Sequence, residues 1–186
     1  MKLFFIRHGE TMHNRDGIIQ GWHDSGLTEL GELQARDAGE NLKDKKLDAV
    51  FTSDLLRTRQ TTEEFLKGYG QNIPIFYDWL LRERTFNSLE NQSRDSLNWS
   101  ELFALPDSDW GEIESPISLD DRMISFVKNL KLLPVRFDNI IVITHGGMLN
   151  ALRRIDGQPD WKKHDNAEIV EYDLDELIGK IERGMK

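Results

Sequence analysis

Two histidines of the sequence each stand at the end of a short apolar run, and both positions are suited to chemistry. Arg7 and His8 follow the run 3–6, and His145 follows the run 140–143. Short runs of aromatic and branched residues are typical of strands that helices cover on both faces. Open parallel sheets bind their ligands outside the carboxyl ends of the strands, so we expect both histidines at one ligand-binding edge.

The segment after His145 predicts that the ligand is an anion. Residues 148–154 have a helical pattern, which places His145 and Gly146 at the turn that begins this helix. The first N–H groups of a helix have no partner within it, and the helix dipole favours negative charge there. A phosphate group fits such a turn, and Gly9, directly after His8, lets the backbone approach it closely.

Two further kinds of charged side chain belong to the predicted site. Arg57 and Arg59 lie in the opening turns of a predicted helix, just past the strand 49–52, and one of them can point back at the ligand. Arginine suits a transferring phosphate because its guanidinium fork binds two oxygens and keeps its charge. Glu83 follows a strand predicted at 74–77 and is a candidate proton donor.

Alternating strands and helices are needed to bring these residues together. The periodicity predicts a largely parallel sheet with helices on its faces, and a last strand at the sheet edge. The predicted strands are 3–6, 49–52, 74–77, 139–144 and 168–174. The predicted helices run from the cap Thr28 to about 42, from the cap Ser53-Asp54 to about 66, from 118 to 133, and from the turn at His145 to an end marked by Gly157 and Pro159.

Finer predictions concern burial. Leu30, Leu33, Ala38 and Leu42 recur at helical spacing and are predicted to lie on the packed face of the first long helix. The charged tail 175–186 is predicted to form a frayed short helix. The histidines in polar stretches are predicted to face solvent, and they are His13, His23 and His164.

Composition limits the classes of function. The 186 residues suit one domain, 1–186, in which the loosely patterned segment 87–116 is a covering excursion or lid. The net charge of −9 is unfavourable for a nucleic-acid partner and leaves small phosphorylated metabolites as the favoured ligands. No apolar run approaches the ~20 residues of a membrane span, and none resembles a signal peptide, so we expect no membrane partner and a cytoplasmic protein. Cysteine is absent, which excludes disulfides and catalytic thiols.

Three segments, in this order and each at a strand end, resemble the histidine phosphatase superfamily in its phosphoglycerate mutase-like branch. The resemblance covers residues 3 to about 150 and implies a three-layer α/β/α sandwich with a mostly parallel sheet. Gln20-Gly21-Trp22 is similar to the family's pattern between the first two segments. The three segments are Arg7-His8-Gly9-Glu10-Thr11 with Asn14, Ser53-Asp54-Leu55-Leu56-Arg57-Thr58-Arg59-Gln60-Thr61, and Thr144-His145-Gly146-Gly147.

The resemblance implies a role for each matched residue. His8 is then the nucleophile that takes the phosphoryl group, and Glu83 is the general acid and later the general base. Arg7, Arg57 and His145 then hold the phosphoryl oxygens. We expect neither a metal nor another cofactor, since the neighbouring cations can neutralise the transferring group themselves. The further positions that match the binding pattern are Asn14, Gln20, Gly21 and Gly146.

Hydrolysis and mutase-type transfer are both compatible with this resemblance. A mutase keeps water from its phosphohistidine and returns the group to bound product, which calls for a closed site. We favour hydrolysis of a small phosphomonoester, because the chain is compact and acidic residues of the excursion repel a second anionic group. These residues are Asp107, Asp109, Glu112 and Glu114.

Two functions outside phosphoryl transfer by histidine also stay open. The first is a non-catalytic phosphate-binding module, since the stretch 86–91 after Glu83 lacks the glycines usual in the family. Asparagine there can adopt the left-handed conformation that such turns require. The second is a metal site built from His8 and His145, although no ligand spacing supports it. The sequence does not identify the substrate or the oligomeric state.

Overall fold

The computed structural model describes residues 1–158 and 161–184, apart from the side chain of Asp107, and is built on one five-stranded sheet. The strands lie in the order β3-β2-β4-β1-β5. Neighbouring strands are parallel except in the last pair, in which β5 runs antiparallel to β1. The strands are β1 Lys2–Arg7, β2 Ala49–Thr52, β3 Ile75–Tyr77, β4 Asn139–Thr144 and β5 Ile169–Asp173.

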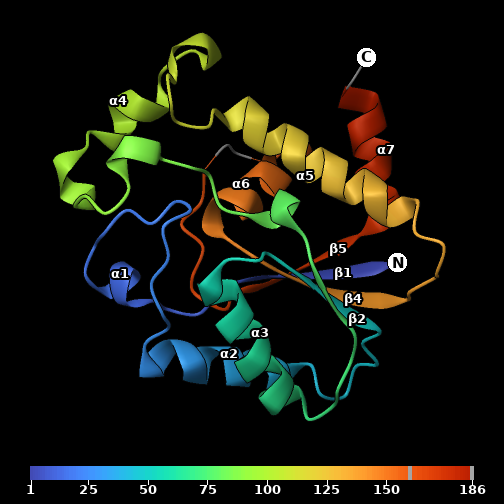
Figure 1. Cartoon of the computed structure of the whole chain (residues 1–186). Coiled ribbons are helices and arrows are strands. Elements are labelled where there is room, and N and C mark those ends of the chain that lie inside the picture. The colour runs from blue at the N-terminus through green and yellow to red at the C-terminus, as the bar shows by residue number, and fades with distance from the viewer. Residues whose placement is uncertain (159–160, 185–186) are drawn as a thin grey trace.

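Helices cover both faces of this sheet (Figure 1), with α2 and α3 on one face and α5, α6 and α7 on the other. The predicted three-layer α/β/α sandwich with a mostly parallel sheet is therefore confirmed. The described helices are α1 Met12–Arg15, α2 Glu29–Asn41, α3 Leu56–Tyr69, α4 Trp99–Phe103, α5 Pro116–Lys131, α6 Gly146–Ile155 and α7 Leu174–Gly184. Short 3₁₀ turns occupy Trp79–Leu81, Asn87–Leu89, Arg94–Ser96 and Asp107–Asp109.

The apolar run of β1 is buried on both of its faces, which explains why it does not alternate with polar residues. Leu3 and Phe5 enter the core beneath α5, α6 and α7, whereas Phe4 and Ile6 enter the core beneath α2 and α3. β4 lies beside β1 in the centre of the sheet and shares this pattern. The two central strands therefore end side by side at the same edge.

The start and end of three helices test the predicted boundaries. Thr28 caps α2, as predicted, because its side chain accepts a hydrogen bond from the Gly31 N–H. α5 begins two positions before the predicted Ser118, since Ser115 provides the cap and Pro116 occupies the first turn. α6 ends at Ile155, before Gly157, and Pro159 lies outside the described residues.

The prediction for the packed face of α2 is confirmed for Ala38 and Leu42, which are buried, and is wrong for Leu30 and Leu33. Leu30 and Leu33 are 52% and 53% exposed, and α2 packs on α3 through small residues instead. A Cβ atom at Gly39 would lie 2.1 Å from the Phe65 carbonyl oxygen, and one at Gly68 would lie 2.0 Å from the Arg36 carbonyl oxygen. Glycine thus lets the two backbones approach closely, which turns the leucines outward.

The carboxyl-terminal helix is also better packed than predicted. α7 buries an apolar stripe at helical spacing against α5 and α6, so it is not a frayed tail. The buried residues of this stripe are Leu174, Leu177, Ile178 and Ile181. Within residues 1–158 and 161–184, no helix is both long and apolar enough to cross a membrane.

Candidate active site

His8 and His145 face each other where β1 and β4 end. The two strands pair in parallel with Arg7 opposite Thr144, so the next residue of each strand is a histidine. Their ring centroids lie 5.2 Å apart, and both side chains are buried. One tetrahedral oxyanion can therefore touch both rings, as the sequence predicts.

A backbone carbonyl fixes the protonation of His8. Nδ1 of His8 lies 2.8 Å from the carbonyl oxygen of Gly9, which can only accept a hydrogen bond. Nδ1 therefore carries the proton, and Nε2 carries the lone pair. The ring presents a nucleophilic nitrogen.

An arginine fixes the opposite tautomer in His145. Nε of Arg57 donates to Nδ1 of His145 over 3.2 Å, and a guanidinium has no acceptor to offer in return. Nδ1 of His145 thus accepts, and its Nε2 carries the proton. That Nε2 is buried without a hydrogen-bond partner. The ring presents a donor.

Both imidazoles are neutral near pH 7. Burial lowers the pKa of His8 well below 6.5, and the charges of Arg57 and Arg7 lower it further. Burial likewise lowers the pKa of His145 well below 6.5, again with Arg57 as the strongest nearby charge. The nucleophilic form of His8 therefore does not need to lose a proton first.

Arg7 supplies a second donor that lacks an acceptor. Its Nη1 donates to the carbonyl oxygen of His164 over 2.6 Å, whereas its Nε is buried without a partner. That Nε lies beside the start of α6, because a Cβ atom at Gly146 would be 3.6 Å from it. The N-cap of α6 is His145, which makes no side-chain capping bond, and the first turn of α6 already donates to an anionic group, since Glu83 accepts from the Gly147 N–H.

Arg57 is fully buried and is held by the loop that follows β1. Its Nη1 pairs with Asp24 over 2.6 Å, and its Nη2 donates to the carbonyl oxygen of Gly21 over 2.8 Å. Gly21 thus contributes to the site through its backbone. Arg59, by contrast, lies over the ring of Tyr77 with its guanidinium carbon 5.5 Å from the ring centroid.

The prediction that Ser53-Asp54 caps α3 is wrong. The N-cap of α3 is Leu55, which makes no side-chain cap, and Asp24 from the earlier loop accepts from the Leu56 N–H over 2.5 Å. Asp54 instead forms an ion pair with Arg82. Asp24 can replace a local cap because the loop folds back over the start of α3.

Glu83 reaches the same edge from the segment after β3. Its Oε2 accepts from the Gly147 N–H over 3.1 Å, and its Oε1 accepts from the Arg84 N–H over 2.8 Å. A Cβ atom at Gly147 would lie 2.1 Å from Oε1 of Glu83, so the carboxylate needs a glycine there. Burial lowers the pKa of Arg7, and the charge of Glu83 opposes that shift.

Arg122 of α5 supports the backbone that carries Glu83. Its Nη1 donates to the carbonyl oxygens of Leu80 and Arg82 at 2.9 and 2.7 Å, and its Nη2 lies 3.2 Å from the Glu83 carbonyl oxygen. The same guanidinium pairs with Glu114 through Nε and Nη2, each over 2.7 Å. The backbone of residues 80–83 is therefore held by Arg122, which is itself paired with Glu114.

Two asparagines in the stretch after Glu83 adopt the left-handed backbone conformation. Asn87 and Asn91 have φ angles of 45° and 66°, in the left-handed region that asparagine tolerates. The prediction for these asparagines is confirmed. Glu90, between them, accepts from the N–H groups of Trp22 and His23 over 3.0 and 2.9 Å.

The side chains of Asn14 and Gln20 are engaged within the loop. Asn14 Oδ1 accepts from the Thr11 N–H over 3.3 Å as part of a capping box at the start of α1. Gln20 Oε1 accepts from the Thr11 hydroxyl over 3.1 Å. Asn166 links Asn14 to His8, because its Nδ2 contacts Asn14 Oδ1 and the carbonyl oxygen of His8. Phosphate binding by Asn14 and Gln20 stays a prediction.

Of the four acidic residues predicted to repel a second anionic group, one is paired within the protein, whereas Asp109 and Glu112 are exposed and their role stays a prediction. Glu114 is turned inward to Arg122, so its charge does not repel a ligand. Arg94 lowers the pKa of Arg7 in addition to burial and therefore adds positive charge near the site. The aromatic side chains of this region contact one another, and they are Phe86, Trp99, Phe103 and Trp110.

Several residues of the site were not predicted. Asp24 and Arg122 act through partners 33 and 39 to 42 positions away, so no local pattern marks them. His164, predicted to face solvent, is buried beside Glu168 while its carbonyl holds Arg7. Of the remaining two histidines, His23 is exposed as predicted and His13 is half-buried.

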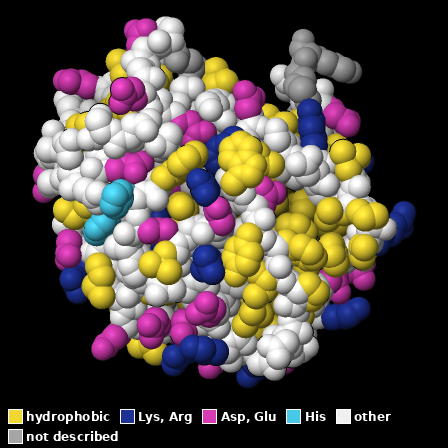
Figure 2. Space-filling model, viewed as in Figure 1, with side chains coloured by type: hydrophobic (Ala, Val, Ile, Leu, Met, Phe, Trp, Pro, Cys, Tyr) yellow, Lys and Arg dark blue, Asp and Glu magenta, His cyan; other side chains and the backbone are white. Residues whose placement is uncertain are grey.

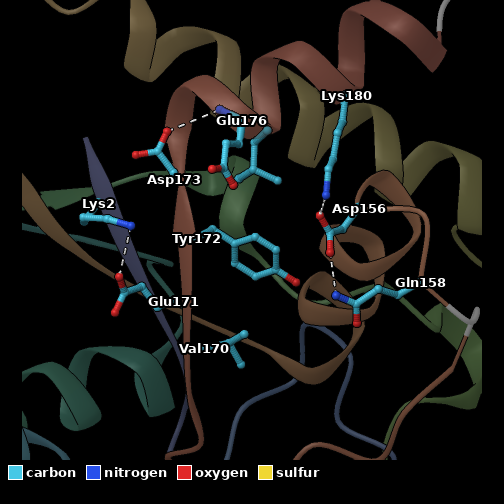
Figure 3. A pocket seen from close by; sticks show the side chains of 10 residues that line it. Lys2, Asp156, Gln158, Val170, Glu171, Tyr172, Asp173, Glu176 and Lys180 are labelled. Carbon is cyan, nitrogen blue, oxygen red and sulfur yellow. Dashed lines mark hydrogen bonds and ion pairs between the residues drawn. The ribbon is translucent and has the colours of Figure 1, made fainter.

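A separate hollow of ≈ 350 Å³ lies between β5, the end of α6 and α7, and contains none of the predicted site residues (Figure 3). Lys180 pairs with Asp156, and Lys2 pairs with Glu171, at its margins. The Tyr172 side chain lies between them, and burial raises its pKa to about 12. In the described parts of the chain, no three His, Asp or Glu side chains gather as metal ligands.

Comparisons with known proteins agree with the resemblance found in the sequence. A family model described as "Histidine phosphatase superfamily (branch 1)" matches residues 3–183. A probable phosphatase of Schizosaccharomyces pombe is 35% identical over 82% of this chain and 72% of its own length. The probable phosphoglycerate mutase GpmB of Escherichia coli is 33% identical over 96% of this chain and 87% of its own. The crystal structure of a putative alpha-ribazole-5'-P phosphatase from Escherichia coli is 27% identical, covers 93% of this chain and 90% of its own, and has a TM-score of 0.77.

Proposed function

Because the chain belongs to the histidine phosphatase superfamily, branch 1, we propose that it hydrolyses a small phosphomonoester through a phosphohistidine formed on His8. One observation carries the proposal: two buried N–H donors, Arg7 Nε and His145 Nε2, have no acceptor. They lie at the ends of β1 and β4, where His8 also presents its lone pair. Unsatisfied buried donors are rare in proteins, and a phosphoryl group supplies the missing acceptors.

In the first step, Nε2 of His8 attacks phosphorus, and the bond from phosphorus to the ester oxygen breaks. Protonated Glu83 gives its proton to that oxygen, so the substrate leaves as an alcohol. His145 and Arg7 donate to the phosphoryl oxygens, while Arg57 holds His145 in the donor tautomer. The Nδ1–H of His8 stays on the Gly9 carbonyl, which orients the ring.

In the second step, water attacks the phosphohistidine and Glu83, now a carboxylate, takes the proton from this water. The bond from phosphorus to Nε2 breaks, which restores neutral His8 and releases inorganic phosphate. The cations of Arg7 and Arg57 neutralise the transferring group, so we assign no metal or other cofactor to either step. A cytoplasmic location and a small phosphorylated metabolite as the partner remain predictions from the sequence.

Release of nitrophenolate from p-nitrophenyl phosphate, with and without a strong chelator, tests this function. We expect a rate that the chelator leaves unchanged and that His8→Ala abolishes. Acid-labile labelling of the wild-type protein by a phosphorylated substrate, absent from the variant, would place the intermediate on His8. A protein that binds phosphate but releases no nitrophenolate would instead be a non-catalytic binding module.

Mutase-type phosphoryl transfer is the second candidate. The likeness to a probable phosphoglycerate mutase supports it, as does the positive charge that Arg94 brings toward Arg7 from the excursion. A mutase needs a bisphosphorylated primer to load its histidine. Isomerisation of a phosphoglycerate that depends on such a primer, with only trace hydrolysis, would favour this candidate over the phosphatase.

A further inference from the structure

The two histidines of the active site lie beneath the surface of the protein. His8 and His145 are 2% and 0% exposed. Figure 2 accordingly shows histidine side chains in only one small area of this face of the molecule. The groups that position the two rings must therefore reach them from within the fold.

The segment 164–168, between α6 and β5, lies against the end of β1. The Ala167 N–H donates to the Arg7 carbonyl oxygen over 3.0 Å, and the Arg7 N–H donates to the Glu168 carbonyl oxygen over 3.3 Å. Nη1 of Arg7 donates to the carbonyl oxygen of His164 over 2.6 Å. The segment therefore holds both the backbone and the side chain of Arg7.

Ala167 has a backbone conformation that alanine seldom adopts. Its φ angle is 57°, in the left-handed region that favours glycine. Such conformations persist only where the surrounding contacts hold them, and they cluster at active sites. The turn at Ala167 accompanies a side-chain contact of the preceding residue, Asn166, with the end of β1.

The Asn166 side chain contacts oxygens of two separate residues. Its Nδ2 lies 2.9 Å from the carbonyl oxygen of His8 and 3.4 Å from Oδ1 of Asn14. A carbonyl oxygen can only accept, so the nitrogen of the Asn166 amide must be the atom that faces His8. This nitrogen carries two N–H groups, one for each oxygen. Asn166 thus joins the backbone of the nucleophile to Asn14.

The amide of Asn14 is oriented by the same contact. Its Oδ1 accepts from the Thr11 N–H over 3.3 Å and faces Nδ2 of Asn166. The reversed amide would place its own N–H groups against these two donors, which is unfavourable. The Nδ2 of Asn14 therefore points away from them, and it has no acceptor in the part of the chain that the structure describes. Asn14 keeps a donor available for a ligand.

We propose that Asn166 is a positioning residue of the active site. It holds the backbone of His8, and it turns the Asn14 amide so that the N–H groups of Asn14 are available to a phosphoryl oxygen. The inference rests on the proposed function in taking a phosphoryl group as the ligand. The hold on His8 affects the rate of transfer through the placement of Nε2, whereas the orientation of Asn14 affects the affinity for phosphate.

Calorimetric titration with inorganic phosphate, over a double-mutant cycle, tests the orientation of Asn14. We expect Asn166→Ala and Asn14→Ala each to weaken phosphate binding about 10-fold or more, as is typical for the loss of a hydrogen bond to a charged group. The double variant binds no more weakly than Asn14→Ala, because Asn166 acts on phosphate through Asn14. Losses that multiply in the double variant, or an unchanged affinity in Asn166→Ala, overturn the proposal.

The rate with p-nitrophenyl phosphate tests the hold on His8. We expect Asn166→Ala to lower kcat by the same factor in the wild-type and the Asn14→Ala backgrounds, because the contact with the His8 carbonyl does not involve Asn14. A merely structural residue would lower the midpoint of thermal unfolding and leave kcat per folded molecule unchanged. That result would overturn the role of Asn166 at His8.

Asn139→Ala is the matched control. Nδ2 of Asn139 also donates to a backbone carbonyl, that of Lys46, over 2.8 Å. Asn139 begins β4, however, and so lies at the opposite end of this strand from His145. We expect this variant to keep the wild-type phosphate affinity and kcat. Equal losses in Asn139→Ala and Asn166→Ala would contradict the proposal.

Two further measurements keep the test decisive. Asn166→Ser is too short to bridge the two oxygens, and it takes the place of Asn166→Ala in the cycle where thermal unfolding shows that the alanine variant is not folded. A wild type that binds phosphate with the expected coupling but releases no nitrophenolate would overturn the proposed hydrolysis and support the orientation of Asn14. A wild type that releases nitrophenolate without the coupling would do the reverse.

Discussion

Arg57 and His145, 88 positions apart, are joined by a hydrogen bond of 3.2 Å in which the guanidinium can only donate. This bond makes one imidazole a donor, while the carbonyl of Gly9 makes the other a nucleophile. Two chemically identical side chains thereby acquire different roles. Each role rests on its own contacts, so single substitutions can separate them.

Arg57→Lys keeps the positive charge but loses the Nε donor that orients His145. We expect kcat with p-nitrophenyl phosphate to fall on the order of 100-fold, as is typical when one preorganised donor is lost. Arg59→Lys is the matched control, since Arg59 lies over Tyr77 and not at the histidines, and it retains the wild-type kcat. Equal losses in the two variants would contradict the role of Arg57.

Glu83→Gln removes the proposed proton donor but keeps the shape of the side chain. We expect kcat to fall much more for alkyl phosphates than for p-nitrophenyl phosphate, because an alkoxide needs protonation and nitrophenolate does not. Steady-state rates with a series of leaving groups measure this difference. If both classes slow equally, Glu83 is not the general acid.

Arg122→Gln disturbs Glu83 indirectly and also leaves Glu114 buried without its partner. Loss of one member of a buried ion pair costs about 3–5 kcal/mol, so we expect a large drop in the free energy of unfolding. At temperatures where the variant is folded, its rates show the leaving-group dependence of Glu83→Gln, and Arg122→Lys restores part of kcat. Arg36→Gln, which breaks a pair between α2 and α3, lowers stability without this dependence.

Gly147→Ala places a methyl group where the Glu83 carboxylate lies, 2.1 Å from Oε1. We expect kcat to fall at least about 10-fold for alkyl phosphates, since the acid must move from the Gly147 N–H. Gly26→Ala is the control, because its Cβ would meet only the Gln60 side chain at 3.6 Å. A wild-type rate in Gly147→Ala would show that Glu83 acts from another position.

Stability is expected to fall in mild acid because of the buried neutral histidines. The pKa of His8 and of His145 is lowered well below 6.5 on folding. At a pH between the lowered pKa of the folded protein and 6.5, the unfolded chain therefore binds more protons than the folded protein. The contribution of the two neutral histidines to the free energy of unfolding is complete above about pH 6.5. It is lost as the pH falls toward their pKa in the folded protein, by at most about 1.4 kcal/mol per pH unit for each histidine.

Urea unfolding of wild type and His8→Asn between about pH 7 and pH 5 measures this contribution. Asparagine cannot be protonated in this range, so the variant loses stability less steeply than the wild type. The His23→Asn control, at an exposed position, follows the wild-type slope. A His8→Asn slope as steep as that of the wild type would refute the assignment.

The sheet and the histidine site were predictable because their signals are local. β1 and β4 are apolar runs that end directly in His8 and His145, so strand and chemistry are adjacent in the sequence. Thr28 marks a helix start through a contact only three positions away. Each of these features depends on neighbours along the chain.

The supporting contacts were not predictable because they join distant segments. Asp24 caps α3 and holds Arg57 from 33 positions away, in place of the local Ser53-Asp54 cap. Leu30 and Leu33 have the spacing of a buried face, but the close approach at Gly39 is a property of two helices together. The hydrophobic periodicity of one helix does not determine which of its faces packs against a neighbouring helix.

The Glu90 side chain joins the loop after β1 to the stretch just beyond Glu83. One carboxylate accepts from the backbone of Trp22 and His23 on the loop after β1, and from the Thr85 hydroxyl and the Phe86 N–H just beyond Glu83. A displacement of the loop would therefore also displace the backbone just beyond Glu83, the proposed proton donor. The positions of the two segments are therefore coupled through one side chain, although 68 residues separate Trp22 from Glu90 in the sequence.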